Sequence, residues 1–210
     1  MKNIRRTIRR VTAVLGTLAL LSTVAVAPAF ASGDQAASTP RAVRPVASLD
    51  LQRYSGTWLQ LAAIPARFTA QCVRDTRAEY TPLPDGLVKV INTCTVADGS
   101  VSTVEGRARV TGPTSNAQLE VTFAQANGQF LFQAAGAYWV IGLDQQSYSW
   151  AVVGDPTRTN GFVLSRAPEL NARQIAGVVR AIVRNGFDPC KFVITATTGG
   201  VETNRPLCSV

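Results

Sequence analysis

The 210-residue chain contains no histidine and only one methionine. Without histidine it cannot assemble a Ser-His-Asp or Cys-His catalytic group. It also lacks the side chain that most often serves as a general base near neutral pH, or as a ligand of zinc, iron or haem. Its four cysteines include no Cys-x-x-Cys pair, the spacing typical of zinc and thiol-redox sites. We therefore expect no cofactor and no metal.

Acidic side chains are scarce beside basic ones, 13 against 21, which gives a formal net charge of +8. Such a balance suggests a nucleic-acid partner until the charges are placed along the chain. Residues 1–31 hold five basic side chains and no acidic one, so the remainder carries 16 basic and 13 acidic side chains, a net +3. We therefore expect no nucleic-acid partner.

The first 31 residues have the composition of a secretory signal peptide. Basic residues at positions 2–10 precede an apolar run over residues 11–21, and small residues flank Phe30. The apolar run is shorter than the roughly 20 residues that cross a bilayer. No cysteine stands at the expected cleavage site to accept a lipid. We expect cleavage after Ala31, secretion and no integral membrane span, with a retained membrane anchor as the alternative.

The four cysteines would then lie in an oxidising compartment. An even number of cysteines in such a compartment favours two disulfides over a metal site or a catalytic nucleophile. Three pairings of these cysteines exist, and the residues alone leave all three open.

Turn-forming residues recur at regular spacing through the rest of the chain, and the stretches between them favour β-branched and aromatic residues. Residues 32–48 lack periodicity and are predicted to form a flexible leader, followed by one folded domain over residues 49–210. Eight strands joined in sequence close an all-β, antiparallel up-and-down barrel around one small-ligand cavity. The expected strands are 55–63, 73–81, 87–96, 101–110, 117–124, 136–143, 148–154 and 161–166.

One helix is expected after the last of these strands. Asn171 is a suitable N-cap with Gln174 three residues later, apolar residues mark one face, and Gly186 suits the C-terminal stop. The apolar face should pack on the outside of the barrel, because no other large surface is available to it. Residues 191–197 can then add a short ninth strand.

Several segments resemble the lipocalin family, and they occur in the family's order. Gly56-Thr57-Trp58 resembles its first signature, residues 138–144 its sixth strand, and residues 162–168 its eighth strand with the terminal arginine. Gly186-Phe187-Asp188 resembles the bacterial lipocalin and apolipoprotein D branch. The resemblance covers about residues 49–197 and implies a barrel that is closed at one end and open at the other.

The resemblance gives structural roles to three residues. In this family the tryptophan closes the bottom of the barrel and the arginine lies across its indole. For this chain it implies a cation–π pair of Trp58 with Arg166, beside Gly56.

The resemblance also narrows the possible disulfide pairings. It places Cys72 and Cys94 on adjacent strands near the open end and implies the bonds Cys72–Cys94 and Cys190–Cys208. A bond from Cys72 to Cys208, similar to one in apolipoprotein D, is the rival pairing.

Alternation along the strands places apolar and aromatic side chains in the barrel, with tyrosine hydroxyls as the few polar groups. Such a lining favours an elongated hydrophobic molecule with its polar head near the mouth, such as a fatty acid, a lysophospholipid or an isoprenoid. The alternative is that these side chains fill the barrel as ordinary core. The predicted ligand-binding residues are Tyr80, Val90, Phe123, Tyr138, Val140, Trp150 and Phe162.

We expect a binding protein rather than an enzyme, with transport, storage or scavenging of a lipid as its task. Arg67, Arg74 and Arg77 are candidates to meet an anionic headgroup at the mouth, with a solvated charged surface as the alternative. A protein-interaction module that uses the apolar mouth loop 62–68 is one other function, and a lipocalin-type enzyme acting on a lipid is a second. The sequence leaves the oligomeric state and peripheral contact with lipid open.

Overall fold

The computed structural model describes residues 42–209. The predicted signal peptide over residues 1–31 and the first part of the predicted leader lie outside the described residues. Within residues 42–209, no helix is long and apolar enough to cross a membrane. The same residues contain no group of three or more His, Cys, Asp or Glu side chains that could hold a metal ion.

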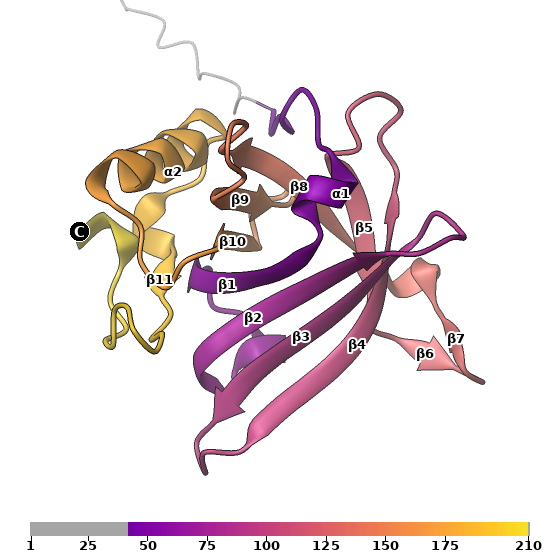
Figure 1. Ribbon diagram of the computed structural model, residues 1–210, viewed down its shortest axis with the longest axis horizontal. Helices are drawn as coiled ribbons and strands as arrows, with labels where there is room; N and C mark the ends of the chain where they lie inside the picture. Colours follow the sequence, from indigo (N-terminus) through magenta and orange to yellow (C-terminus); the bar gives the residue numbers. More distant parts are fainter. Residues whose placement is uncertain (1–41, 210) are drawn as a thin grey trace, which may run out of the picture. The chain divides into compact units, whose positions relative to one another are not determined.

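Eight antiparallel strands form the wall of a barrel (Figure 1). They are β1 (Gly56–Ala63), β2 (Cys72–Pro82), β3 (Val88–Val96), β4 (Val101–Val110), β5 (Gln118–Thr122), β8 (Gly136–Leu143), β9 (Trp150–Gly154) and β10 (Gly161–Ser165). Each strand pairs with the next, and β1 also pairs with β10, which closes the wall. The expected eight-stranded up-and-down barrel is confirmed, because every predicted strand overlaps one of these eight.

The remaining strands lie outside this wall. β11 (Val193–Ile194) pairs with the end of β1 as the expected ninth strand, although it is shorter than predicted. β6 (Gln125–Ala126) and β7 (Gln129–Phe130) form a small hairpin that was not expected. Asn127 and Gly128 both have positive φ at its turn, as a tight two-residue hairpin requires.

Two α-helices complete the fold. α1 (Leu51–Tyr54) is a single turn capped by the Asp50 carboxylate, and it was not predicted. α2 (Ala172–Arg184) is the predicted helix, with the capping box that Asn171 and Gln174 suggest. Gly186 has a φ of +73°, which suits the stop that follows α2. Short 3-10 helices occur at Arg67–Thr69, Phe132–Ala134, Pro189–Lys191 and Leu207–Ser209.

The apolar side chains form two cores, one inside the barrel and one outside it. The outer core lies between the wall and α2, where Val178 and Ile182 are fully buried. In β9, Ala151 and Val153 belong to the inner core while Trp150 and Val152 belong to the outer one. This wall of β8 to β10 is therefore apolar on both faces, whereas the outward residues of β4 are largely exposed.

Residues 42–48 differ from the expected flexible leader. The side chain of Val43 is buried in the outer core, and the Arg44 N–H donates to Asn185 Oδ1 over 2.7 Å. The Val46 N–H donates to the carbonyl of Val140 over 2.8 Å. These buried and hydrogen-bonded positions extend the folded domain to residue 42 at least.

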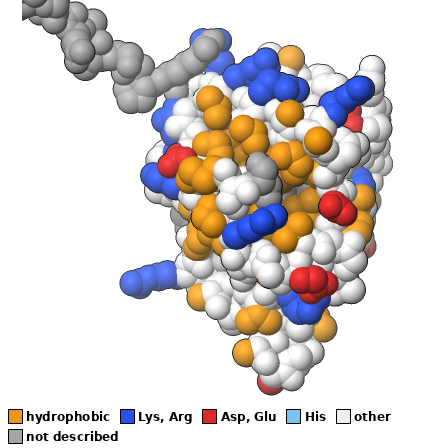
Figure 2. Space-filling model, turned by 90° about the vertical axis from the view of Figure 1, so that its left-hand side faces the viewer, with side chains coloured by type: hydrophobic (Ala, Val, Ile, Leu, Met, Phe, Trp, Pro, Cys, Tyr) orange, Lys and Arg blue, Asp and Glu red, His pale blue; other side chains and the backbone are white. Residues whose placement is uncertain are grey.

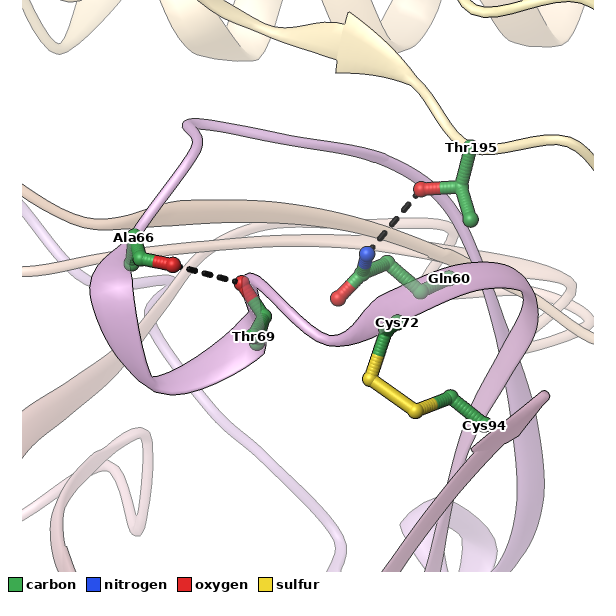
Figure 3. Close-up of a disulfide and its surroundings, with 6 residues drawn as sticks. All are labelled: Gln60, Ala66, Thr69, Cys72, Cys94 and Thr195. Carbon is green, nitrogen blue, oxygen red and sulfur yellow. Dashed lines mark hydrogen bonds between the residues drawn. A yellow bond between two sulfur atoms is a disulfide. The ribbon is translucent and has the colours of Figure 1, made fainter. Parts of the chain in front are cut away.

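The structure contains the disulfides Cys72–Cys94 and Cys190–Cys208, which is the predicted pairing rather than the rival Cys72–Cys208. The first joins the start of β2 to β3 near the open end of the barrel (Figure 3). The second joins the segment before β11 to the C-terminal tail, so each disulfide closes a local loop.

Candidate functional site

The closed end of the barrel is built around Trp58 and Arg166, as the sequence predicts. Trp58 is fully buried, and the Arg166 guanidinium carbon lies 3.8 Å from the centre of its ring. Arg166 also donates to three backbone carbonyls, those of Arg53, Ser55 and Thr57, over 2.6 to 3.0 Å. The backbone therefore holds the Arg166 guanidinium on the outer side of the indole, while the Trp58 ring packs in the inner core, and together they seal this end of the barrel.

Three tyrosines converge above Trp58, and we call them the tyrosine triad: Tyr54 from α1, Tyr80 from β2 and Tyr138 from β8. The Tyr138 hydroxyl lies 2.9 Å from that of Tyr54 and 2.8 Å from that of Tyr80. The ring of Tyr54 lies 4.9 Å from Trp58 and 5.5 Å from Tyr80, centre to centre. The triad therefore forms a polar floor at the closed end of the barrel.

Burial controls the ionisation of the triad. Removal from water raises the pKa of Tyr80 to about 12, and it raises the pKa values of Tyr54 and Tyr138 well above the usual value for tyrosine. The hydroxyls are neutral at physiological pH, as in any tyrosine, and the shift keeps them neutral into the alkaline range, so each can donate as well as accept hydrogen bonds.

A cavity of about 20 Å³ lies against the triad. This volume is enough for about one water molecule. The lining has no charged side chain and consists of Leu51, Tyr54, Tyr80, Val88, Ala108, Leu119, Val121 and Tyr138. The closed end of the barrel is therefore nearly filled by side chains.

The inner face becomes accessible to solvent toward the open end. Along β4, Ala108, Gly106 and Val104 share the inward side, and Val104 is 44 % exposed. Phe123 follows β5 and is 38 % exposed. Its ring packs over Gly106, where an added Cβ would lie 2.7 Å from the ring. Two apolar side chains of the inner face are thus open to solvent at the mouth.

Five of the seven predicted ligand-binding residues belong to the inner core or pack against it. Tyr80, Val90 and Val140 are buried there, and Tyr138 and Phe162 pack against them while partly exposed. Phe123 lies higher, at the mouth. Their role in binding a ligand stays a prediction.

The interior placement of Trp150 is wrong. Its indole packs in the outer core against α2, where a Cβ on Gly177 would lie 2.8 Å from Cζ2. Because the outer face of β9 is covered by a helix, both faces of the strand are apolar, and alternation could not tell which one points inward. Val152, on the same face, also belongs to the outer core.

Sequence reasoning missed Tyr54 and Asn92. Tyr54 stands four residues before Trp58, and its carbonyl accepts the indole N–H over 2.8 Å, a link that only the unexpected helix α1 creates. Asn92 follows Val90 on the inward side of β3, so strand alternation could have found it. Its Oδ1 is buried and has no hydrogen-bond partner within the described part of the chain.

The three arginines expected at the mouth do not act together. Arg74 is engaged by Asp75 and Glu202, over 3.0 and 2.9 Å, and thereby ties β2 to the C-terminal tail. Arg77 lies opposite Leu59 and Thr93, on the side of β2 that alternates with the inward Ala78 and Tyr80. The solvated-surface alternative therefore describes Arg74 and Arg77 better than a headgroup site.

A second cavity of about 270 Å³ lies outside the barrel, between β1 and β10 on one side and the C-terminal tail on the other. Leu61, Val163 and Ile175 contribute apolar surface, while Glu169 and Arg205 contribute charge. Figure 2 shows the side of the molecule that carries α2 and β11, with hydrophobic side chains gathered in its middle and basic ones around them. This groove shares no lining residue with the tyrosine floor.

Comparison with known proteins agrees with this architecture. Residues 49–197 match the family model described as a lipocalin-like domain. Temperature-induced lipocalin-1 of Arabidopsis thaliana is 34% identical over 148 residues, which are 70% of this chain and 78% of that protein. Outer membrane lipoprotein Blc of Escherichia coli K12 is 36% identical over 155 residues, 73% of this chain and 82% of the relative.

Among solved structures, insecticyanin from the tobacco hornworm Manduca sexta superposes with a TM-score of 0.58. It is 21% identical and covers 75% of this chain and 85% of its own, a likeness that shows the fold alone. The family model, the two relatives and the barrel sealed by Trp58 and Arg166 all lead to one assignment. The chain belongs to the lipocalin family.

Proposed function

We propose that this lipocalin is a secreted carrier that binds a small lipid-like molecule inside the barrel, through the open end. The observation that carries the proposal is the inner face itself. It is mainly apolar above the tyrosine floor, with Asn92 as a buried polar exception, and it exposes Val104 and Phe123 to solvent at the mouth. Covering such surface with an apolar ligand releases about 25 cal/mol per Å². Family membership supports a small hydrophobic ligand, and lipocalins are mostly binders rather than enzymes.

A matched pair of substitutions in β4 tests the binding site. Val104 points inward and Val101 points outward, and both are exposed, by 44 % and 61 %. Val104→Glu places a charge in the path of the ligand and should weaken binding of a fluorescent fatty-acid probe by about tenfold or more. Val101→Glu should leave it within about twofold. Equal losses of affinity in the two variants, or no loss in either, would contradict binding inside the barrel.

Native mass spectrometry of the protein purified from its own host tests whether the protein carries a lipid. A co-purifying lipid would support the carrier. Phe68 is 62 % exposed in the mouth loop, which keeps a protein-interaction module as the second candidate. An unliganded barrel with a bound protein would favour that module, and turnover of an added lipid would favour an enzyme.

Secretion belongs to the same proposal and rests on the composition of residues 1–31. Mass spectrometry of the exported protein should find Ser32 as the first residue. An intact Met1 on protein that stays with the cells would instead support a retained anchor.

A further inference from the structure

The tyrosine triad holds one more hydrogen than its own hydrogen bonds use. Three hydroxyls carry three hydrogens, and two hydroxyl–hydroxyl bonds, Tyr54 to Tyr138 and Tyr138 to Tyr80, use two of them. No other hydrogen bond to these hydroxyl oxygens occurs within residues 42–209. Whichever way the two bonds run, one O–H remains without an acceptor. A buried donor of this kind favours a partner strongly, because leaving it unpaired is costly.

The space beside that hydrogen fits one oxygen atom. The cavity of about 20 Å³ touches all three tyrosines, and its other lining residues, such as Leu51, Val88 and Leu119, offer only apolar side chains. A carbonyl or hydroxyl oxygen has about the size of the water molecule that such a volume accommodates. The apolar remainder of a ligand would then lie above the triad, toward Val104 and Phe123.

The chemistry of this floor disfavours an anion. The triad is neutral at physiological pH, as tyrosine ordinarily is, and burial raises its pKa values further. The nearest cation on this axis is Arg166, which lies beyond the Trp58 indole with N–H groups donating to the carbonyls of Arg53, Ser55 and Thr57. A carboxylate at the floor would therefore lose its hydration for a single neutral donor, which is insufficient compensation.

We propose that the tyrosine triad is a subsite for one uncharged acceptor oxygen, so that the preferred ligand enters with a ketone, aldehyde, quinone or alcohol group first and its apolar body toward the mouth. This inference rests on the proposed function, since it requires a ligand in the barrel. It reverses the orientation that the sequence suggests, in which the polar head stays near the mouth.

The test compares three ligands of equal chain length by displacement of one fluorescent apolar probe from the wild-type protein: 2-undecanone, undecane and undecanoate. A neutral hydrogen bond should make the ketone bind about 3- to 10-fold more tightly than the alkane. Undecanoate should gain nothing from the floor, because its charge stays at the open end.

The decisive variant removes all three hydroxyls: Tyr54→Phe/Tyr80→Phe/Tyr138→Phe. Any single Tyr→Phe substitution still leaves a hydroxyl with a free hydrogen, so single variants should keep the preference for the ketone. In the triple variant, the affinity for 2-undecanone should fall to about that for undecane. The affinities for undecane and undecanoate themselves should change less than about twofold. Tyr148→Phe is the matched control, because its buried hydroxyl accepts from the Asp50 N–H and does not line the cavity.

The outcomes separate the two proposals. If neither alkane nor ketone displaces the probe, the proposed function fails. If both displace the probe equally in the wild type, the carrier function stands and the acceptor subsite is overturned. This comparison uses only the wild-type protein, so it is decisive even if the triple variant does not fold. A ketone preference that survives in a folded triple variant would also overturn the subsite.

Discussion

Gly142 of β8 and Ala181 of α2 approach so closely that a Cβ on Gly142 would overlap the Cβ of Ala181. Both atoms are attached directly to backbone, so neither can rotate away. The contact fixes α2 against the wall beside the bulge that separates Val140 from Gly142.

Gly142→Ala should therefore lower the free energy of unfolding by about 1–3 kcal/mol through overpacking. Ala181→Gly should cost about 1 kcal/mol through helix propensity. The double variant should be more stable than the sum of the two losses predicts, because the second change makes room for the first. Urea unfolding of the four proteins measures this coupling, and strict additivity would contradict the contact.

Arg166→Lys should destabilise the barrel by about 2–3 kcal/mol, because an ammonium group cannot stack on Trp58 and reach three carbonyls at once. Arg109→Lys is the control. That side chain stacks on Phe132 at 4.4 Å and pairs with Glu120 at the surface, so its replacement should cost less than about 1 kcal/mol. Similar losses in the two variants would argue against a special role for Arg166.

Replacing Cys190 and Cys208 together by Ser should lower the free energy of unfolding by about 3 kcal/mol, the chain-entropy value for a loop of this length. The tail packs in the outer core through Leu207, outside the barrel. Probe binding should consequently persist in the folded variant under conditions where the wild type binds. A loss of binding that exceeds the loss of folded protein would mean that the tail shapes the interior.

The tyrosine triad should make the protein sensitive to alkaline pH. In the unfolded chain a tyrosine loses its proton near pH 10, whereas burial in the folded state raises the pKa of Tyr80 to about 12 and those of its two partners well above the usual value. The folded state then binds more protons than the unfolded state above roughly pH 10, so stability is present below that pH and falls as the pH rises toward 12.

Urea unfolding between pH 9 and pH 11 measures that slope. The triple Phe variant should show a smaller decline than the wild type over the same range, because it lacks the three shifted groups. Equal slopes would show that the hydroxyls are not shielded in the folded protein.

The order of the eight barrel strands and of α2 was predictable because these elements carry local signals. The turn at Asn127-Gly128 and the capping box at Asn171 and Gln174 are set by residues close in sequence. The disulfide pairing came from family resemblance, because the residues alone left three pairings open. The Trp58–Arg166 stack came from the same source, because its two partners are distant in the chain.

The interior of the barrel was harder to predict wherever a strand is covered on both sides. Trp150 and Ala151 are both apolar neighbours, and only the position of α2 decides which one faces inward. The triad needed Tyr54, which reaches the interior through a one-turn helix whose existence depends on the Asp50 cap. The hydrogen bonds among the three hydroxyls join segments more than 50 residues apart and leave no local pattern.

The two kinds of wall have a mechanical consequence. Around β8 to β10 the barrel wall has a second layer, because α2 and the residues after it pack on its outer surface. Around β2 to β4 the barrel is a single sheet, and β4 exposes charged side chains such as Glu105 and Arg109 to water. We therefore expect that a ligand too wide for the interior would displace strands β2 to β4, while β8 to β10 keep their positions.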